Sequence, residues 1–292
     1  MKSLYDVPAP AKLNLFLHVT GQRSDGYHLI QSVFMLIDWC DTLHFERRDN
    51  GLIERIDVLA DSNLALPAED LIVRAARALQ AACGTTFGVT IRLEKRIPAQ
   101  AGMGGGSSDA ASCLLALQRL WGVKLPRDKL LEIALGLGAD VPFFLCGGHA
   151  WVEGVGEKIT PISLPAADFV VVKPPQGLET QAIFSSKLLK RDSETATIEG
   201  FLKTSQNQFF DFGRNDLQPI ASQLCPDVSL SLDWLAKNNL AGRMTGSGSA
   251  VFARVNQDEG QGASQGTNLS SAPSSWKIRE CSNLQSHPLA DW

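Results

Sequence analysis

A glycine-rich loop that leads directly into an apolar helical pattern restricts the fold more than any other feature of this chain. Residues 98–111 read PAQAGMGGGSSDAA, with four glycines among the five residues 102–106. Residues without a Cβ atom let backbone amides approach a ligand closely. A helix is predicted to follow, capped by Ser107 or Ser108 and ended at Gly122. Because unpaired amides and the helix dipole both favour anions there, we expect a polyphosphate to bind this loop.

This loop differs from the better-known phosphate-binding sequences. A Walker A loop needs a lysine directly after the glycines, and none is present. A dinucleotide fingerprint counted from Gly102 needs a glycine where Ser107 stands. The His-Arg-Asp signature of protein kinases is absent from the chain. The alternative of a flexible surface loop is disfavoured, because Pro98, the cap and the helix form an ordered sequence of signals.

Composition restricts the class of protein. The chain has 292 residues, 44% of them hydrophobic and 20% charged, which is typical of a soluble globular protein of one or two domains. Its net charge of −4 argues against nucleic-acid and anionic-membrane partners. Six scattered cysteines without a C-x-x-C pair indicate a reducing compartment. Neither a signal peptide nor a membrane span is recognisable, so a cytoplasmic location is expected.

Hydrophobic periodicity predicts strands followed by helices in each of two halves. The first half is expected to contain strands at 12–19, 32–38, 42–47, 52–59 and 89–94 and helices at 70–82, 110–121 and 126–137. The second half is expected to contain a strand at 168–173, helices near 180–190, 216–224 and 227–239, and a strand–loop–strand unit at 242–253. This order predicts an α+β fold. We expect an N-terminal domain at 1–155, a C-terminal domain at 156–292 and a disordered polar segment at 257–275.

Five separated segments together resemble one superfamily. PAKLNL at 10–15, the loop at 98–111 and TGSGS at 245–249 resemble the three motifs of the GHMP small-molecule kinases. GQRSDGYH at 21–28 and GADVPFF at 138–144 are similar to the branch that phosphorylates cytidine diphosphate methylerythritol in the non-mevalonate route to isoprenoids. The resemblance implies a two-domain GHMP kinase fold with the active site in the cleft between the domains. It also implies ATP as phosphate donor, Mg²⁺, and the 2-hydroxyl of that small molecule as acceptor.

The resemblance also assigns two catalytic residues. Asp140, in the GADVP segment, matches the carboxylate that accepts the hydroxyl proton, and Lys12 would lie beside it and offset charge on the transferring group. Without the resemblance, such an aspartate is usually a turn residue and such a lysine a solvated edge charge. Spacing identifies no magnesium ligands, since the metal needs few protein ligands when phosphates supply the rest. Ser107 and Ser108 are candidates for the phosphates or the metal.

Two sets of binding residues follow from the same matches. The predicted ATP site comprises Pro98, Ala99, Gln100, Ala101, Gly102, Met103, Gly104, Gly105, Gly106, Ser107 and Ser108. The predicted substrate site comprises Asn14, Tyr27, His28, Thr180, Phe184, Gly246, Ser247 and Gly248. Tyr27 would stack on the cytosine, His28 would read its polar edge, and Phe184 would cover the other face unless it is a core residue.

The remaining members of these sets have narrower expected roles. Asn14 should face the methylerythritol end, because one strand presents it on the same side as Lys12. Thr180 would hold the pyrophosphate or the sugar. Residues 246–248 would support the glycine loop and approach the substrate phosphates through backbone amides.

The sequence alone leaves some assignments open. Another GHMP kinase, acting on mevalonate, homoserine or a sugar, is one alternative, and a non-catalytic sensor of ATP and sugar is another. Lys95 and Arg96 flank the loop and either contact the nucleotide or are solvated. Asp70 stands where members of the family commonly have asparagine near the nucleotide base, so no binding role is carried over to it.

Overall fold

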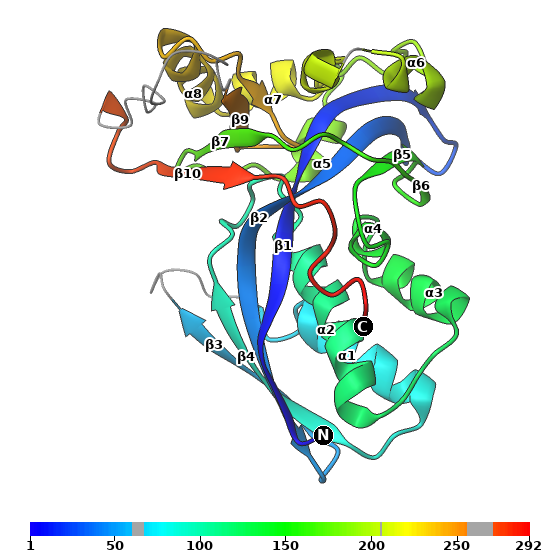
Figure 1. The fold of residues 1–292 in the computed structure, drawn as a ribbon. Helices are drawn as coiled ribbons and strands as arrows, with labels where there is room; N and C mark the ends of the chain where they lie inside the picture. Colours follow the sequence, from blue (N-terminus) through cyan, green and yellow to red (C-terminus); the bar gives the residue numbers. More distant parts are fainter. Residues whose placement is uncertain (60–66, 205, 256–270) are drawn as a thin grey trace.

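Two β-sheets with helices packed against them are joined by a pair of long strands (Figure 1). The computed structural model describes residues 1–59, 67–204, 206–255 and 271–292. The strands of the described residues are β1 (Ser3–Gln22), β2 (His28–Arg48), β3 (Ile53–Leu59), β4 (Gly88–Lys95), β5 (Ala150–Gly154), β6 (Lys158–Pro161), β7 (Asp168–Lys173), β8 (Arg243–Met244), β9 (Val251–Val255) and β10 (Lys277–Ser282). The helices are α1 (Leu71–Cys83), α2 (Gly105–Trp121), α3 (Arg127–Leu137), α4 (Val141–Phe144), α5 (Thr180–Phe184), α6 (Ile198–Leu202), the 3₁₀ turn η1 (Gln206–Asp211), α7 (Gln218–Leu224) and α8 (Pro226–Lys237). The α+β class expected from the sequence is confirmed.

The first sheet has the strand order β3-β4-β2-β5-β6, with β1 paired to β2. Its strands are antiparallel except for the parallel pair β3 and β4. Helices α1 and α2 pack against each other beside this sheet and bury a common apolar core. Asp70 caps α1 by accepting from the Val73 amide at 3.0 Å, and Gly84 ends it in the left-handed conformation. The predicted helix at 70–82 is therefore confirmed within one residue at each end.

Strands β1 and β2 are longer than the alternating patterns indicated. The two strands predicted at 32–38 and 42–47 are segments of the single 21-residue strand β2. The register of the pairing between β1 and β2 shifts at several points, one of them between Pro10 and Lys12. Such irregularities bend a strand and change where its side chains point. The pair therefore continues from the first sheet into the second half of the molecule (Figure 1), where Leu13 and Leu15 join a second core.

The second sheet has the order β10-β7-β9-β8 and is antiparallel throughout. Helices α7 and α8 lie beside it and share a third apolar core with it. Residues 283–292 then return to the first sheet, where the Leu284 amide donates to the Leu36 carbonyl at 3.0 Å and Leu289 enters the first core. Strand β6 also belongs to the first sheet, although it follows residue 155. The domain boundary at 155/156 stays a prediction.

The start of α2 and the segment 257–275 differ from, or lie outside, what the sequence predicts. Ser107 and Ser108 do not cap α2, because the helix begins at Gly105 and its N-cap is Gly104, at a φ of 69°. The chain makes its turn at the left-handed glycine, so both serines already lie within the helix. Most of the segment predicted to be disordered, 257–275, lies outside the described residues, which resume at Ser271. Among the described residues no helix is long and apolar enough to cross a membrane.

Candidate active site

A cavity of about 1280 Å³ lies between β1, the glycine loop, Asp140 and the segments that carry α5 and residues 246–248. It brings together motifs separated by more than 200 positions. The predicted site residues that line it are Lys12, Asn14, Tyr27, His28, Pro98, Ala99, Gln100, Ala101, Gly102, Met103, Gly104, Gly105, Gly106, Asp140, Thr180, Phe184, Gly246, Ser247 and Gly248. Ser107 and Ser108 do not line it, and Ser108 is fully buried.

Lys12 and Asp140 form an ion pair in this cavity. Lys12 Nζ lies 3.8 Å from Asp140 Oδ2, and the lysine side chain is 4% exposed whereas the aspartate side chain is 35% exposed. Burial lowers the pKa of Lys12, and the neighbouring Asp140 carboxylate opposes that shift. Asp140 immediately precedes α4, yet its side chain makes no capping hydrogen bond. Its carboxylate thus reaches solvent in the cavity, beside a buried cation.

Asn14 extends the polar network around Lys12. Lys12 Nζ donates to Asn14 Oδ1, and Asn14 Nδ2 donates to Ser32 Oγ at 2.9 Å. The backbone amide of Asn14 donates to Thr245 Oγ1 at 2.9 Å. Lys12 and Asn14 therefore share one face of β1, as predicted, and Asn14 links the lysine to Ser32 of β2. The lysine ammonium also lies 4.7 Å from the centre of the Phe34 ring, which supports its position.

The TGSGS segment packs directly under the glycine loop. The amides of Ser249 and Ala250 donate to the carbonyls of Gln100 and Ala101 at 3.1 and 3.3 Å. A Cβ at Gly102 would collide with the Thr245 carbonyl, and Gly102 has a φ of 71°. The backbones of the two segments are thus in direct contact, and this close approach leaves no room for a side chain at Gly102. The segment therefore contacts the loop through its backbone, and the expected approach of residues 246–248 to the substrate phosphates stays a prediction.

A buried ionic cluster at the start of α2 was missed by sequence reasoning. Lys95 Nζ donates to Asp41 Oδ2, and to Asp109 Oδ2 at 2.8 Å. Asp41 Oδ1 also accepts from the amides of Arg96 and Ile97 at 2.5 and 2.7 Å. Burial favours the neutral amine, but both carboxylates outweigh it and raise the pKa of Lys95, whereas burial raises the pKa of Asp109. Lys95 is therefore an internal cation, and the solvated alternative is wrong.

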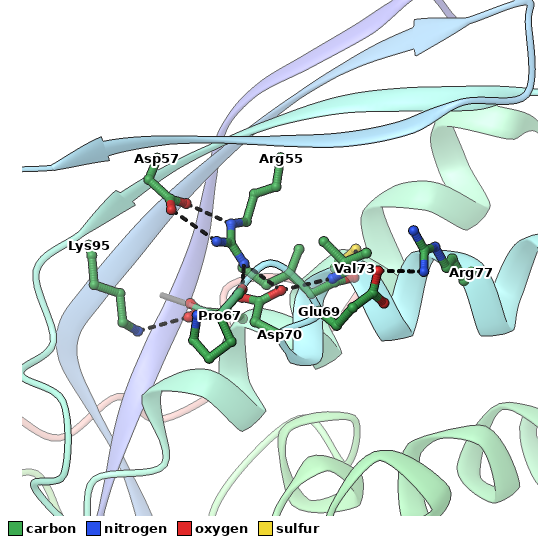
Figure 2. A network of polar contacts seen from close by, with 11 residues as sticks. Arg55, Asp57, Pro67, Glu69, Asp70, Val73, Arg77 and Lys95 are labelled. Carbon is green, nitrogen blue, oxygen red and sulfur yellow. Dashed lines mark hydrogen bonds and ion pairs between the residues drawn. The ribbon is translucent and has the colours of Figure 1, made fainter. Parts of the chain in front are cut away.

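Asp70, which stands where members of the family commonly have asparagine, lies beside a cation. Figure 2 shows Arg55 of β3 between Asp57 and Asp70, with Lys95 nearby. Arg55 Nη1 lies 2.8 Å from Asp70 Oδ1, and Arg55 also bonds both carboxylate oxygens of Asp57 at 2.6 and 2.9 Å. Asp70 is thus paired with a cation on a neighbouring strand, which it shares with Asp57, while the same oxygen caps α1.

The opposite part of the cavity gathers aromatic groups. Tyr27 is 65% exposed and therefore contributes little to the core. His28 packs on Phe184, with ring centres 4.9 Å apart and planes inclined by 35°. Thr180 Oγ1 and Ser247 Oγ lie 2.7 Å apart, and this contact joins α5 to the TGSGS segment. These residues lie together as the resemblance implied, and their substrate contacts stay predictions.

Comparison with known proteins places the chain in one family. Residues 70–148 match the GHMP kinases N terminal domain model and residues 195–266 match the GHMP kinases C terminal model. The chain is 68% identical over its whole length to the 4-diphosphocytidyl-2-C-methyl-D-erythritol kinase of Polaromonas sp. strain JS666, covering 95% of that protein. It is 60% identical over its whole length to that of Acidovorax sp. strain JS42, covering 99%. The chain belongs to the 4-diphosphocytidyl-2-C-methyl-D-erythritol kinase family.

Solved structures agree with this family and with the wider superfamily. A crystal structure of 4-(cytidine 5'-diphospho)-2C-methyl-D-erythritol kinase matches with a TM-score of 0.73 at 34% identity, over 87% of this chain and 90% of the other. The homoserine kinase of Cytophaga hutchinsonii matches with a TM-score of 0.69 at 16% identity, over 98% and 96% of the two chains. The second likeness shows the fold alone. The predicted GHMP kinase fold is thereby confirmed.

Proposed function

We propose that this chain transfers the terminal phosphate of ATP to the 2-hydroxyl of 4-diphosphocytidyl-2-C-methyl-D-erythritol. Family membership supports the reaction, and the Lys12–Asp140 pair facing the glycine loop is the observation that carries the mechanism. Phosphoryl transfer depends mostly on positioning and on stabilising charge, with one group to accept the hydroxyl proton. The glycine loop offers backbone amides for the donor, and residues from the second half of the chain close the acceptor side.

Asp140 is suited to accept the proton. Its carboxylate lies in the cavity, makes no capping hydrogen bond and reaches solvent, so an acceptor hydroxyl can approach it. Lys12 is almost fully buried, and Asn14 and Asp140 hold its ammonium at the same point. A fixed cation in a poorly solvated site stabilises negative charge that develops on the transferring group. The proposed proton acceptor, Asp140, and the stabilising cation, Lys12, are therefore the two members of one ion pair.

The residues around the loop also fit a magnesium-bound nucleotide. Ser108 Oγ and Asp109 Oδ1 are buried oxygens without a hydrogen-bond partner in the described structure, and both lie at the start of α2. Hard oxygen donors of this kind suit Mg²⁺. Among the described residues no group of three acidic, histidine or cysteine side chains could hold a metal. When bound with ATP, the ion would neutralise phosphate charge, and Asp109, which lines the cavity, is the residue that would hold it.

The experiment is ADP release from ATP and magnesium with the cytidylyl substrate, comparing the wild-type chain with Asp140→Asn. Loss of the proton acceptor should lower kcat by roughly 10²–10⁴-fold while ATP still binds. Asp49→Asn is a matched control, because that carboxylate is 79% exposed at the end of β2 and should leave turnover unchanged. Full activity in Asp140→Asn would refute its role as base. Turnover of mevalonate without turnover of the cytidylyl substrate would refute the acceptor, and no turnover at all would favour a sensor.

A further inference from the structure

Arg191 bonds the imidazole of His28 from outside the predicted base site. Arg191 Nε donates to His28 Nε2 at 2.9 Å. A guanidinium carries only donors, so the nitrogen that it contacts must present a lone pair. His28 is then neutral, and its single ring proton resides on Nδ1. Desolvation, followed by the charge of Arg191, lowers the pKa of His28, in agreement with a neutral ring.

Three backbone carbonyls hold the guanidinium in its orientation. Arg191 Nη1 donates to the Leu189 carbonyl at 3.0 Å, and Nη2 donates to the carbonyls of Phe184 and Ser186 at 3.0 and 2.8 Å. No acidic partner of Arg191 is found in the described parts of the chain, so this arginine serves hydrogen bonding rather than an ion pair. The planar fork fixes the direction of its Nε–H, and a lysine could not reproduce that geometry.

We infer that Arg191 is a positioning residue that fixes His28 in its Nδ1–H tautomer and thereby sets which base the cavity accepts. The inference rests on the proposed function, because it takes the cavity lined by His28 and Phe184 as the base site. A ring held as an Nδ1–H donor matches the unprotonated N3 of cytosine. Uracil carries a hydrogen on N3 and would meet it donor to donor. A free histidine could exchange tautomers and would discriminate less between the two bases.

The same arginine also bonds the segment that carries Phe184, the other aromatic residue of the predicted base site. Its Nη2 bonds the carbonyl of Phe184, whose ring packs on His28 at 4.9 Å. Arg191 therefore holds the His28 ring directly and the backbone that carries the Phe184 ring, without lining the cavity itself. Its effect on the reaction should appear in substrate binding rather than in phosphate transfer, since Asp140 and Lys12 belong to a different network.

The first test reads the tautomer in the free protein. The two ring nitrogens of a neutral histidine have distinct ¹⁵N shifts according to which carries hydrogen, and a His28→Gln spectrum assigns the signal among the five histidines. We expect the Nδ1–H form in the wild-type chain and a loss of that preference in Arg191→Lys and Arg191→Gln. Lys190→Gln is the matched control, because Lys190 is the adjacent exposed cation and pairs with Asp192. An Nε2–H tautomer in the wild-type chain would overturn the inference.

The second test uses kinetics. Both Arg191 variants should raise KM for the cytidylyl substrate roughly tenfold, about the value of one hydrogen bond, with kcat within about twofold. The preference for the cytidylyl over the uridylyl analogue should fall with it. In a His28→Asn background, which has no tautomer, the further loss of Arg191 should have little effect on KM. An equal effect in that background would mean that Arg191 only supports its loop, which would overturn the inference.

These outcomes separate the inference from the proposed function. The spectroscopic result needs no substrate, so an Nδ1–H tautomer could be observed in a chain that fails to release ADP, and only the proposed function would then fall. Conversely, normal turnover with unchanged KM and base preference in both Arg191 variants would refute the role of Arg191 and leave the kinase assignment intact.

Discussion

Replacing Lys95 by methionine tests whether the buried ionic cluster at the start of α2 is as consequential as its geometry suggests. The Lys95 side chain is 9% exposed, Asp41 is fully buried and Asp109 is 3% exposed. Asp41 would keep its two backbone amide donors, but Asp109 would lose its partner, because its other oxygen has none in the described structure. Removing one member of a buried ion pair costs roughly 3–5 kcal/mol. At about 2–4 °C per kcal/mol, this corresponds to a Tm lower by about 6–20 °C.

Thermal unfolding followed by calorimetry measures this effect. Lys129→Met is the matched control, because that lysine is 52% exposed and pairs with Glu132 one helical turn away. Such a pair contributes about 0.5 kcal/mol or less. The double variant Lys95→Met/Asp109→Leu should recover at least half of the lost Tm, since it removes the unpaired charge. A loss no larger than that of the control, or no recovery in the double variant, would refute the reasoning.

Three further predictions follow from other parts of the molecule. Gly102→Ala should disrupt the loop and raise KM for ATP at least tenfold, because the residue has a φ of 71° and faces the Thr245 carbonyl; an unchanged KM would contradict the close packing. Tyr27→Ala should weaken substrate binding by roughly 1–3 kcal/mol while leaving kcat nearly unchanged, as measured by steady-state kinetics; an unchanged KM would remove Tyr27 from the site. Burial lowers the pKa of His149 and of His287 to about 4, against 6.5 in the unfolded chain. The stability that depends on these two histidines being neutral is fully present above pH 6.5 and is lost as the pH falls towards 4. Denaturant titrations should therefore show the free energy of unfolding decreasing by about 3 kcal/mol per histidine across that window. An equally steep decrease after both histidines are replaced by glutamine would assign the pH dependence to other groups.

Local signals in the sequence were sufficient for most elements. Helix α1 carries its own cap at Asp70 and its own stop at Gly84, and the apolar run of β7 has the predicted bounds. Each of these signals acts through hydrogen bonds or φ preferences within a few residues. The predicted serine cap of α2 was wrong because glycine at position 104 can adopt a conformation that moves the start of the helix earlier. Where the sequence allows a helix to begin at either of two positions, as at the start of α2, tertiary packing decides between them.

The sequence alone was enough to predict the class of enzyme, since the motifs at Lys12, Asp140 and the glycine loop resemble those of the small-molecule kinases, and the comparisons confirmed that family. Only the tertiary structure decided which charges meet. Asp41 and Lys95 lie 54 positions apart, and His28 and Arg191 lie 163 apart. Their interactions depend on distance in space and on the removal of water, and neither quantity is encoded in sequence separation. The sequence of the glycine loop predicts a site for the phosphate donor, whereas the fold determines how firmly that loop and the proposed acceptor site are held.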